Sequence, residues 1–138
     1  MVTDEFLAEM LPRQLAAEKA LCRGDVAPRR QTWSHHEPVT VFGAAGIPVR
    51  HGWDDVSSLF DDVAGRFAGV DAYEFELVAA GASGDLAYTV GFEHKTAVVD
   101  GRTVTYTLRV THVYRREDGD WRLIHRHADF PPRDQRRP

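Results

Sequence analysis

A period-two alternation over the second half of the chain limits the possible folds more than any other feature. From Ala72 onward, four runs place apolar side chains at every second position, as in a β-strand with one buried face. Three short segments containing glycine, 81–85, 100–102 and 117–120, separate these runs. Tight turns between consecutive runs predict an antiparallel meander of four long strands, apolar on one face.

The first half of the chain has helical periodicity instead. In two stretches, mostly apolar residues recur every three or four positions. They are Leu7, Met10, Gln14, Ala17 and Leu21 in the first stretch, and Trp53, Val56, Phe60, Val63 and Phe67 in the second. Thr3 and Gly24 are the expected ends of the first helix, and Gly52 and Gly69 flank the second.

The apolar face of the sheet needs a cover, and the two long helices are the elements that can supply it. A short helical turn over 28–33 and a short strand over 36–42 complete the predicted elements. The predicted fold class is therefore α+β, with helices packed over the concave face of a curved antiparallel sheet.

Size and composition are typical of one domain, because 138 residues with 43% hydrophobic residues are enough for a single core. We expect this domain to span 3–130, followed by a flexible Pro/Arg tail at 131–138. A net charge of -4 argues against a nucleic-acid partner. The acidic start of the chain and the lack of a long apolar run argue against a secretion signal and a membrane partner, so we expect a cytoplasmic protein.

The alternation also gathers ionisable side chains on a surface that is otherwise apolar. His125, His127 and Asp129 are expected on the inner face of the last strand, the face that Trp121 begins. His112 is expected beside them on the preceding strand. Apolar walls with a few convergent polar groups are typical of a small-molecule site.

We predict that this pocket binds a small, largely apolar molecule. Its walls are expected to come from the long helices and from the inner faces of the strands. The predicted lining consists of Trp33, Phe60, Phe67, Tyr88, Phe92, Tyr106, Val110, His112, His125 and His127.

Two functions remain open for such a pocket. The first is binding without catalysis. The second is a cofactor-free isomerase, dehydratase, cyclase or hydrolase, with acid–base chemistry at histidine and aspartate and a tyrosine hydroxyl as hydrogen-bond donor. The candidate catalytic residues are His125, His127, Asp129, His112 and Tyr88. For each histidine alone, a structural role beside a carboxylate or a backbone carbonyl is the alternative.

We expect no metal and no other cofactor. His125 and His127 point the same way on a strand, and His112 could be a third ligand, but the set lacks a convincing third and fourth partner.

The outer face of the sheet is expected to hold charged residues together with uncharged ones. The charged residues expected there are Glu74, Glu76, Arg109, Arg122 and Arg126. The uncharged ones are Thr105, Thr107, Val113 and Ile124. A mixed surface of this kind suits contact between two copies, so we expect a homodimer through the outer face.

Several short motifs resemble the SnoaL-like branch of the nuclear-transport-factor-2-like (NTF2-like) superfamily. They are Thr32-Trp33-Ser34-His35 with Pro38-Val39, then Phe42-Gly43, Gly52-Trp53 and the terminal segment 119–127. The terminal segment is the most specific, since a last strand of the type Gly-x-Trp-x-Ile-x-x-x-His recurs in this group. The resemblance covers about residues 3–130, and the order of the predicted elements agrees with it.

This resemblance implies a cone-shaped barrel, an apolar pocket between helices and sheet, and frequent dimers through the outer face of the sheet. It does not imply one reaction. Members of the superfamily include isomerases, dehydratases, cyclases, epoxide hydrolases and non-catalytic binding or association domains. The function therefore has to be argued from the site.

Overall fold

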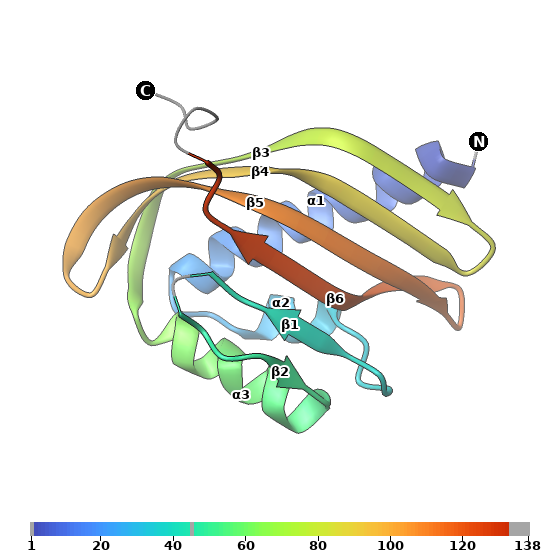
Figure 1. Ribbon diagram of the computed structural model, residues 1–138, viewed down its shortest axis with the longest axis horizontal. Helices are drawn as coiled ribbons and strands as arrows, with labels where there is room; N and C mark the ends of the chain where they lie inside the picture. The colour runs from blue at the N-terminus through green and yellow to red at the C-terminus, as the bar shows by residue number, and fades with distance from the viewer. Residues whose placement is uncertain (1, 45, 133–138) are drawn as a thin grey trace.

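The computed structural model describes residues 2–44 and 46–132 and has the predicted α+β architecture. Helices lie against one side of a curved six-stranded sheet that stays open (Figure 1). The helices are α1 (Val2–Cys22), α2 (Ala27–Thr32) and α3 (Trp53–Ala64). The strands are β1 (Thr40–Phe42), β2 (Arg50–His51), β3 (Phe67–Ser83), β4 (Leu86–Val99), β5 (Arg102–Glu117) and β6 (Asp120–Asp129). Of the tail predicted at 131–138, residues 133–138 lie outside the described part of the chain.

The four long strands form the predicted antiparallel meander, and the sheet order is β2-β1-β6-β5-β4-β3. β1 continues the sheet beyond β6 and runs parallel to it. The strand predicted over 36–42 begins only at Thr40. β2 was not predicted, because a strand of two residues is too short to show an alternation.

Two of the meander turns follow from Asp-Gly pairs in the sequence. Asp100 and Gly101 have φ angles of 51° and 80°, and Asp118 and Gly119 have φ angles of 51° and 86°. Two consecutive residues with positive φ match the right-handed twist of a hairpin, and Asp-Gly is a preferred pair for this geometry. These turns fix the register of β4 with β5 and of β5 with β6.

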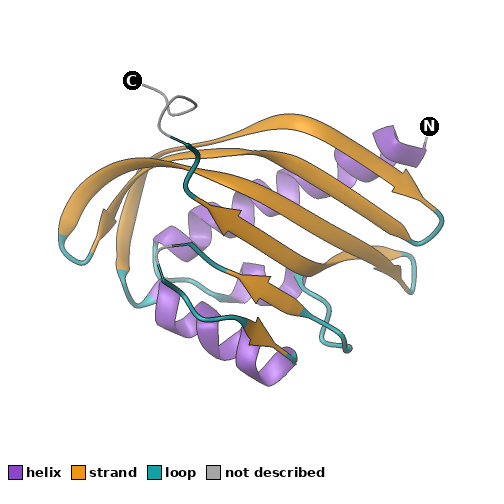
Figure 2. Ribbon diagram, viewed as in Figure 1, coloured by secondary structure: helices purple, strands orange, loops and turns teal. Residues whose placement is uncertain are grey.

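The helices cover the sheet along the faces that their periodicity predicts. α1 buries Phe6, Met10 and Leu21, and it runs along one side of the long strands (Figure 2). α3 buries Val56, Leu59, Phe60 and Ala64. Phe67, which we expected in this helix, is instead the first residue of β3, because α3 ends at Ala64.

An aromatic core holds the helices against one end of the sheet. Phe6 of α1 lies edge-on to Tyr114 and Trp121, with ring centroids 4.9 Å and 5.1 Å apart. Trp33, which follows α2, lies against Phe60 of α3 at 5.4 Å. Beyond this core, the long strands continue and enclose a space that side chains do not fill.

An extra residue in β6 changes which of its side chains face inward. Val113 pairs with His125 and Tyr114 pairs with Leu123, so Ile124 has no partner on β5. A β-bulge of this kind shifts the alternation by one position. The buried side chains of β6 are therefore at odd positions before the bulge and at even positions after it.

Candidate functional site

A cavity of about 590 Å³ lies between the helices and the concave side of the sheet. Its apolar wall comes from α1, β1, the segment after β1, and α3. This wall includes Leu21, Val41, Ile47, Leu59, Phe60 and Val63. The long strands add further uncharged lining, including Phe67, Val104 and Leu108. Charged side chains also line the cavity, and they are Glu18, Arg29, Arg66, Lys95, Asp100, Arg102 and Arg126.

Five ionisable side chains at the inner end of the cavity form what we call the inner charge cluster: Glu18, Arg29, Glu93, Lys95 and Arg126. Glu18 of α1 and Arg29 of α2 form a buried ion pair. Lys95 Nζ lies 3.6 Å from Glu18 Oε2, and Arg126 Nη1 lies 3.9 Å from Glu18 Oε1. Burial, together with the positive charge of Arg126, lowers the pKa of Arg29 to about 9. Arg29 therefore stays charged at neutral pH.

Glu93 is fully buried and is held by groups from two other strands. Arg126 donates to both of its carboxylate oxygens, at 2.7 Å and 3.2 Å, and the Tyr73 hydroxyl donates at 2.6 Å. Burial alone would raise the pKa of Glu93, but Arg126 and Lys95 lower it well below its ordinary value. Glu93 and Arg126 are therefore both ionised in the folded protein.

His112 lies beside this ion pair and is neutral. Arg126 Nη1 donates to His112 Nε2 at 3.0 Å, which places the ring proton on Nδ1, 3.5 Å from the Tyr114 hydroxyl. Burial and the neighbouring Arg126 charge lower the pKa of His112 well below its ordinary value. His112 is buried next to Arg126, and it does not line the cavity.

Lys95 lies among three aromatic rings. Its ammonium lies 5.2 Å from the ring centroid of Phe67, 5.6 Å from that of Tyr73 and 5.7 Å from that of Tyr106. The Tyr106 hydroxyl and the Cys22 thiol also lie within its reach. Burial raises the pKa of both groups, so neither brings a negative charge to Lys95 at neutral pH.

The structure places only part of the predicted lining around the cavity. Phe60, Phe67 and Tyr106 line it. Trp33, Val110 and His112 are buried on the inner side of the fold but do not line the cavity. The predicted inward placement of the remaining residues is wrong, because their side chains lie on the outer face of the sheet: Tyr88, Phe92, His125, His127 and Asp129.

The bulge in β6 explains the error for the last strand. The prediction extended the alternation of Trp121 and Leu123 without interruption, but Ile124 shifts it. Arg126, which we expected on the outer face, therefore points inward, and His125 points outward.

For β4 the prediction assigned the two faces of the strand the wrong way round. The more apolar set of alternate residues, which includes Tyr88 and Phe92, faces outward, and Tyr88 is 44% exposed. The inner set contains Glu93 and Lys95, because these side chains have charged partners inside the fold. The rule that an apolar strand face turns inward fails where the interior holds a charge cluster.

On the outer face, the predicted catalytic residues make contacts of their own. Thr40 Oγ1 lies 2.7 Å from His125 Nδ1. Asp129 accepts a hydrogen bond from Arg109 on each of its two oxygens, at 2.7 Å and 2.9 Å, and His127 Nε2 lies 3.9 Å from Oδ2. Burial lowers the pKa of His125. No part of this group reaches the cavity, and its proposed catalytic role stays a prediction.

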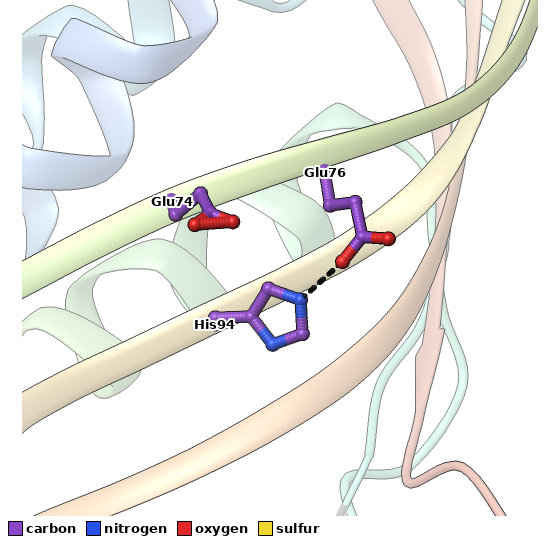
Figure 3. Close-up of side chains that lie close together, drawn as sticks. All are labelled: Glu74, Glu76 and His94. Atoms are coloured by element: carbon purple, nitrogen blue, oxygen red, sulfur yellow. Dashed lines mark hydrogen bonds and ion pairs between the residues drawn. The ribbon is translucent and has the colours of Figure 1, made fainter. Parts of the chain in front are cut away.

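His112, His125 and His127 do not converge on one metal ion, since His112 faces inward while His125 and His127 face outward. Within the described residues, a different trio could approach an ion, namely Glu74, Glu76 and His94 on the outer face of β3 and β4 (Figure 3). His94 bonds to Glu76 at 2.8 Å and to Thr107 at 2.8 Å through its two ring nitrogens. These two bonds account for its orientation without an ion.

Sequence reasoning missed the inner charge cluster, although two signals point to it. Glu18 follows Gln14 by four positions and precedes Leu21 by three, so it belongs to the buried face of the first helix. Glu93 and Lys95 are two positions apart, so they must share one face of their strand. Neither signal shows that the shared face is the inner one.

Comparison with known proteins supports the fold. Residues 16–132 match the family described as SnoaL-like domain. The comparison with curated proteins found no match. Within the described residues, no helix is long and apolar enough to cross a membrane.

Solved structures with the same fold share little sequence with this chain. A candidate dehydratase of the NTF2-like family from Streptomyces avermitilis is 20% identical, with a TM-score of 0.74 over 94% of this chain and 98% of its own. A candidate aromatic ring hydroxylase from Novosphingobium aromaticivorans is 18% identical, with a TM-score of 0.77 over 93% and 90%. A ketosteroid isomerase-like protein from Erwinia carotovora is 18% identical, with a TM-score of 0.73 over 93% and 98%. At such identities, the likeness shows the fold and no activity.

Proposed function

Because the chain belongs to the SnoaL-like domain family, and because its helices and sheet surround a cavity, we propose that it binds a small, largely apolar molecule there. The observation that carries this proposal is the cavity itself, about 590 Å³ with an apolar wall from α1, α3 and the segment after β1. Sites for small molecules typically have volumes of roughly 300–1,000 Å³ and mostly apolar linings with a few polar groups.

The binding test uses a neutral bicyclic probe, naphthalene-2-carboxamide, titrated by isothermal calorimetry. Saturable binding of one probe per chain is expected. Val63→Trp adds bulk to the cavity wall and should weaken binding at least about 10-fold, because the indole takes up the space of the probe. Val49→Trp is the matched control, since Val49 is 59% exposed and does not line the cavity. Equal affinity in the two variants, or no binding to the wild type, would contradict the proposal.

A second candidate function, cofactor-free acid–base catalysis, is favoured by one observation. Glu18 Oε2 is buried at the cavity and, among the described residues, has no hydrogen-bond partner. A carboxylate oxygen in this position could take a proton from a bound molecule, and the Tyr106 hydroxyl could donate a hydrogen bond to the oxygen where charge develops. This version of the function uses cavity residues in place of His125, His127 and Asp129.

Deuterium uptake tests the catalytic candidate. Wild-type protein in D₂O is incubated with 1-tetralone, and exchange at the carbon next to the carbonyl is followed by NMR. Acceleration that Glu18→Gln abolishes, with Glu5→Gln as the control at an exposed position of α1, would support catalysis. The same slow exchange with wild type, with Glu18→Gln and without protein would leave binding as the function.

We also propose that two copies associate through the outer face of the sheet. Apolar side chains are exposed there, including Val78 at 61% and Tyr88 at 44%. Apolar surface of this kind on a sheet is a common feature of interfaces between copies. Light scattering at micromolar concentration should give twice the chain mass of 15.5 kDa, and a species of 15.5 kDa alone would refute the dimer.

A further inference from the structure

The lining of the cavity is positively charged, although the whole chain is negative. Five cations and two carboxylates line it, a net charge of +3. Glu93, which lies behind Arg126, reduces this local charge to +2. The full chain has a net charge of -4. A concave, low-dielectric site with the opposite sign to the rest of the molecule attracts anions.

The buried part of this charge has too few carboxylates for its cations. Glu93 is engaged by Arg126 and Tyr73, and Glu18 forms its buried ion pair with Arg29. Three cations of the inner charge cluster thus share two carboxylates. Buried charges are stabilised when each has a partner of opposite sign, so one cation is left to be matched.

Lys95 is that cation. Its nearest carboxylate oxygen among the described residues, Glu18 Oε2, is 3.6 Å away, which is longer than a good hydrogen bond. Glu93, two positions earlier on the same face of β4, also acts on Lys95 but is already engaged by Arg126 and Tyr73. The aromatic rings, the hydroxyl and the thiol around the ammonium are uncharged at neutral pH. The Lys95 side chain is 4% exposed and lines the cavity, so a bound molecule is well placed to supply the missing negative charge.

We propose that the molecule bound in the cavity carries a carboxylate on an apolar body, and that Lys95 binds this carboxylate with Tyr106 beside it. The inference rests on the proposed function, because it specifies the ligand of the same cavity. One ammonium and one hydroxyl supply donors for the two oxygens of a carboxylate. A dianion such as a phosphate monoester would carry one negative charge more than the single unmatched cation of the inner charge cluster. The rim residue Arg102 adds further positive charge along the cavity.

The test compares two probes of nearly equal shape, naphthalene-2-carboxylate and naphthalene-2-carboxamide, by calorimetry on wild-type protein at neutral pH. Hydrogen bonds to a charged group are stronger than those to a neutral one, so the carboxylate should bind at least about 10-fold more tightly. This comparison needs no substitution, so it decides the inference even if a variant fails to fold.

Two lysines occur in the chain, which gives a matched pair of variants. Lys95→Met keeps the length of the side chain and removes its charge, and it should reduce the preference for the carboxylate to less than about 3-fold. Lys19→Met, on α1 and outside the cavity lining, should keep the preference. Lys95→Arg should keep most of it, because the charge remains.

The outcomes separate the two proposals. If both probes bind wild type equally, the inference is overturned while binding of an apolar molecule stands. If neither binds, both are overturned. If the carboxylate is preferred and folded Lys95→Met keeps that preference, the assignment to Lys95 is overturned. Preference in wild type and in Lys19→Met, with its loss in Lys95→Met, supports the inference.

Discussion

Replacing Glu93 by glutamine tests whether the inner charge cluster is ionised, as its geometry indicates. Glu93→Gln retains the size and shape of the side chain and removes its negative charge. Arg126 would then be buried next to a neutral amide, with Glu18 Oε1 3.9 Å from its Nη1. The two bonds that Arg126 donates to Glu93, at 2.7 Å and 3.2 Å, would lose their charged acceptor.

The magnitude follows from the burial of the pair. Removing one partner of a buried ion pair destabilises a protein by about 3–5 kcal/mol. Glutamine still accepts one hydrogen bond, so we expect about 3 kcal/mol. For 138 residues, the entropy of unfolding is about 0.29 kcal/mol/K, so the melting temperature should fall by about 10 °C.

Urea unfolding followed by circular dichroism measures this change, and a double variant separates the pair from its surroundings. Glu93→Gln combined with Arg126→Met should be more stable, by about 2 kcal/mol or more, than the sum of the single effects, because the second change removes the unpaired cation. Glu74→Gln, on the exposed outer face of the neighbouring strand, is the control and should change stability by less than about 1 kcal/mol.

Two results would refute the reasoning. One is a loss of less than about 1 kcal/mol for Glu93→Gln, which would mean that the pair is not ionised or that water reaches it. The other is additive behaviour of the two substitutions within about 0.5 kcal/mol, which would mean that Glu93 and Arg126 stabilise the fold independently.

Three further predictions follow from the positions of single residues. Because burial and Arg126 hold the pKa of His112 below its ordinary value of about 6.5, the unfolded chain binds a proton that the folded protein does not. Stability should therefore decrease as the pH is lowered below about 6.5, by about 1.4 kcal/mol per pH unit from this group. Urea unfolding of His112→Gln at several pH values should show a stability that lacks this contribution to the pH dependence. His125→Ala should reduce the free energy of unfolding by less than about 1.5 kcal/mol and leave probe affinity in the cavity within about 2-fold. A larger change of affinity in calorimetry would show that His125 contributes to the site. Gly119→Ala should lose about 1–2 kcal/mol in thermal unfolding, because Gly119 has a φ of 86° and only the backbone conformation opposes the added methyl group, whereas Gly65→Ala at a φ of -65° should be close to neutral.

Local patterns in the chain were enough to predict most of the fold. The helical spacing around Leu7 and Val56, the four alternating runs and the Asp-Gly turns all depend on neighbours a few positions apart. The element order, the meander and the α+β class follow from them, and the structure confirms each. β2 was not predicted, because it has only two residues and no local repeat marks it.

The site depended on contacts between distant parts of the chain. Alternation divides a strand into two faces, but only the packed helices decide which face is inside, and in β4 the inner face holds Glu93 and Lys95. Glu18 on α1 and Arg126 on β6 are 108 positions apart, and folding brings their charged groups to 3.9 Å.

The bulge at Ile124 shows the same contrast between local pattern and tertiary contacts at a single residue. Its one-residue shift turns His125 outward and Arg126 inward, and nothing in the local alternation marks where it occurs. Sequence periodicity alone therefore determined the elements and their order. The tertiary structure decided which side chains meet in the cavity, because register and buried charge pairs depend on partners far away along the chain.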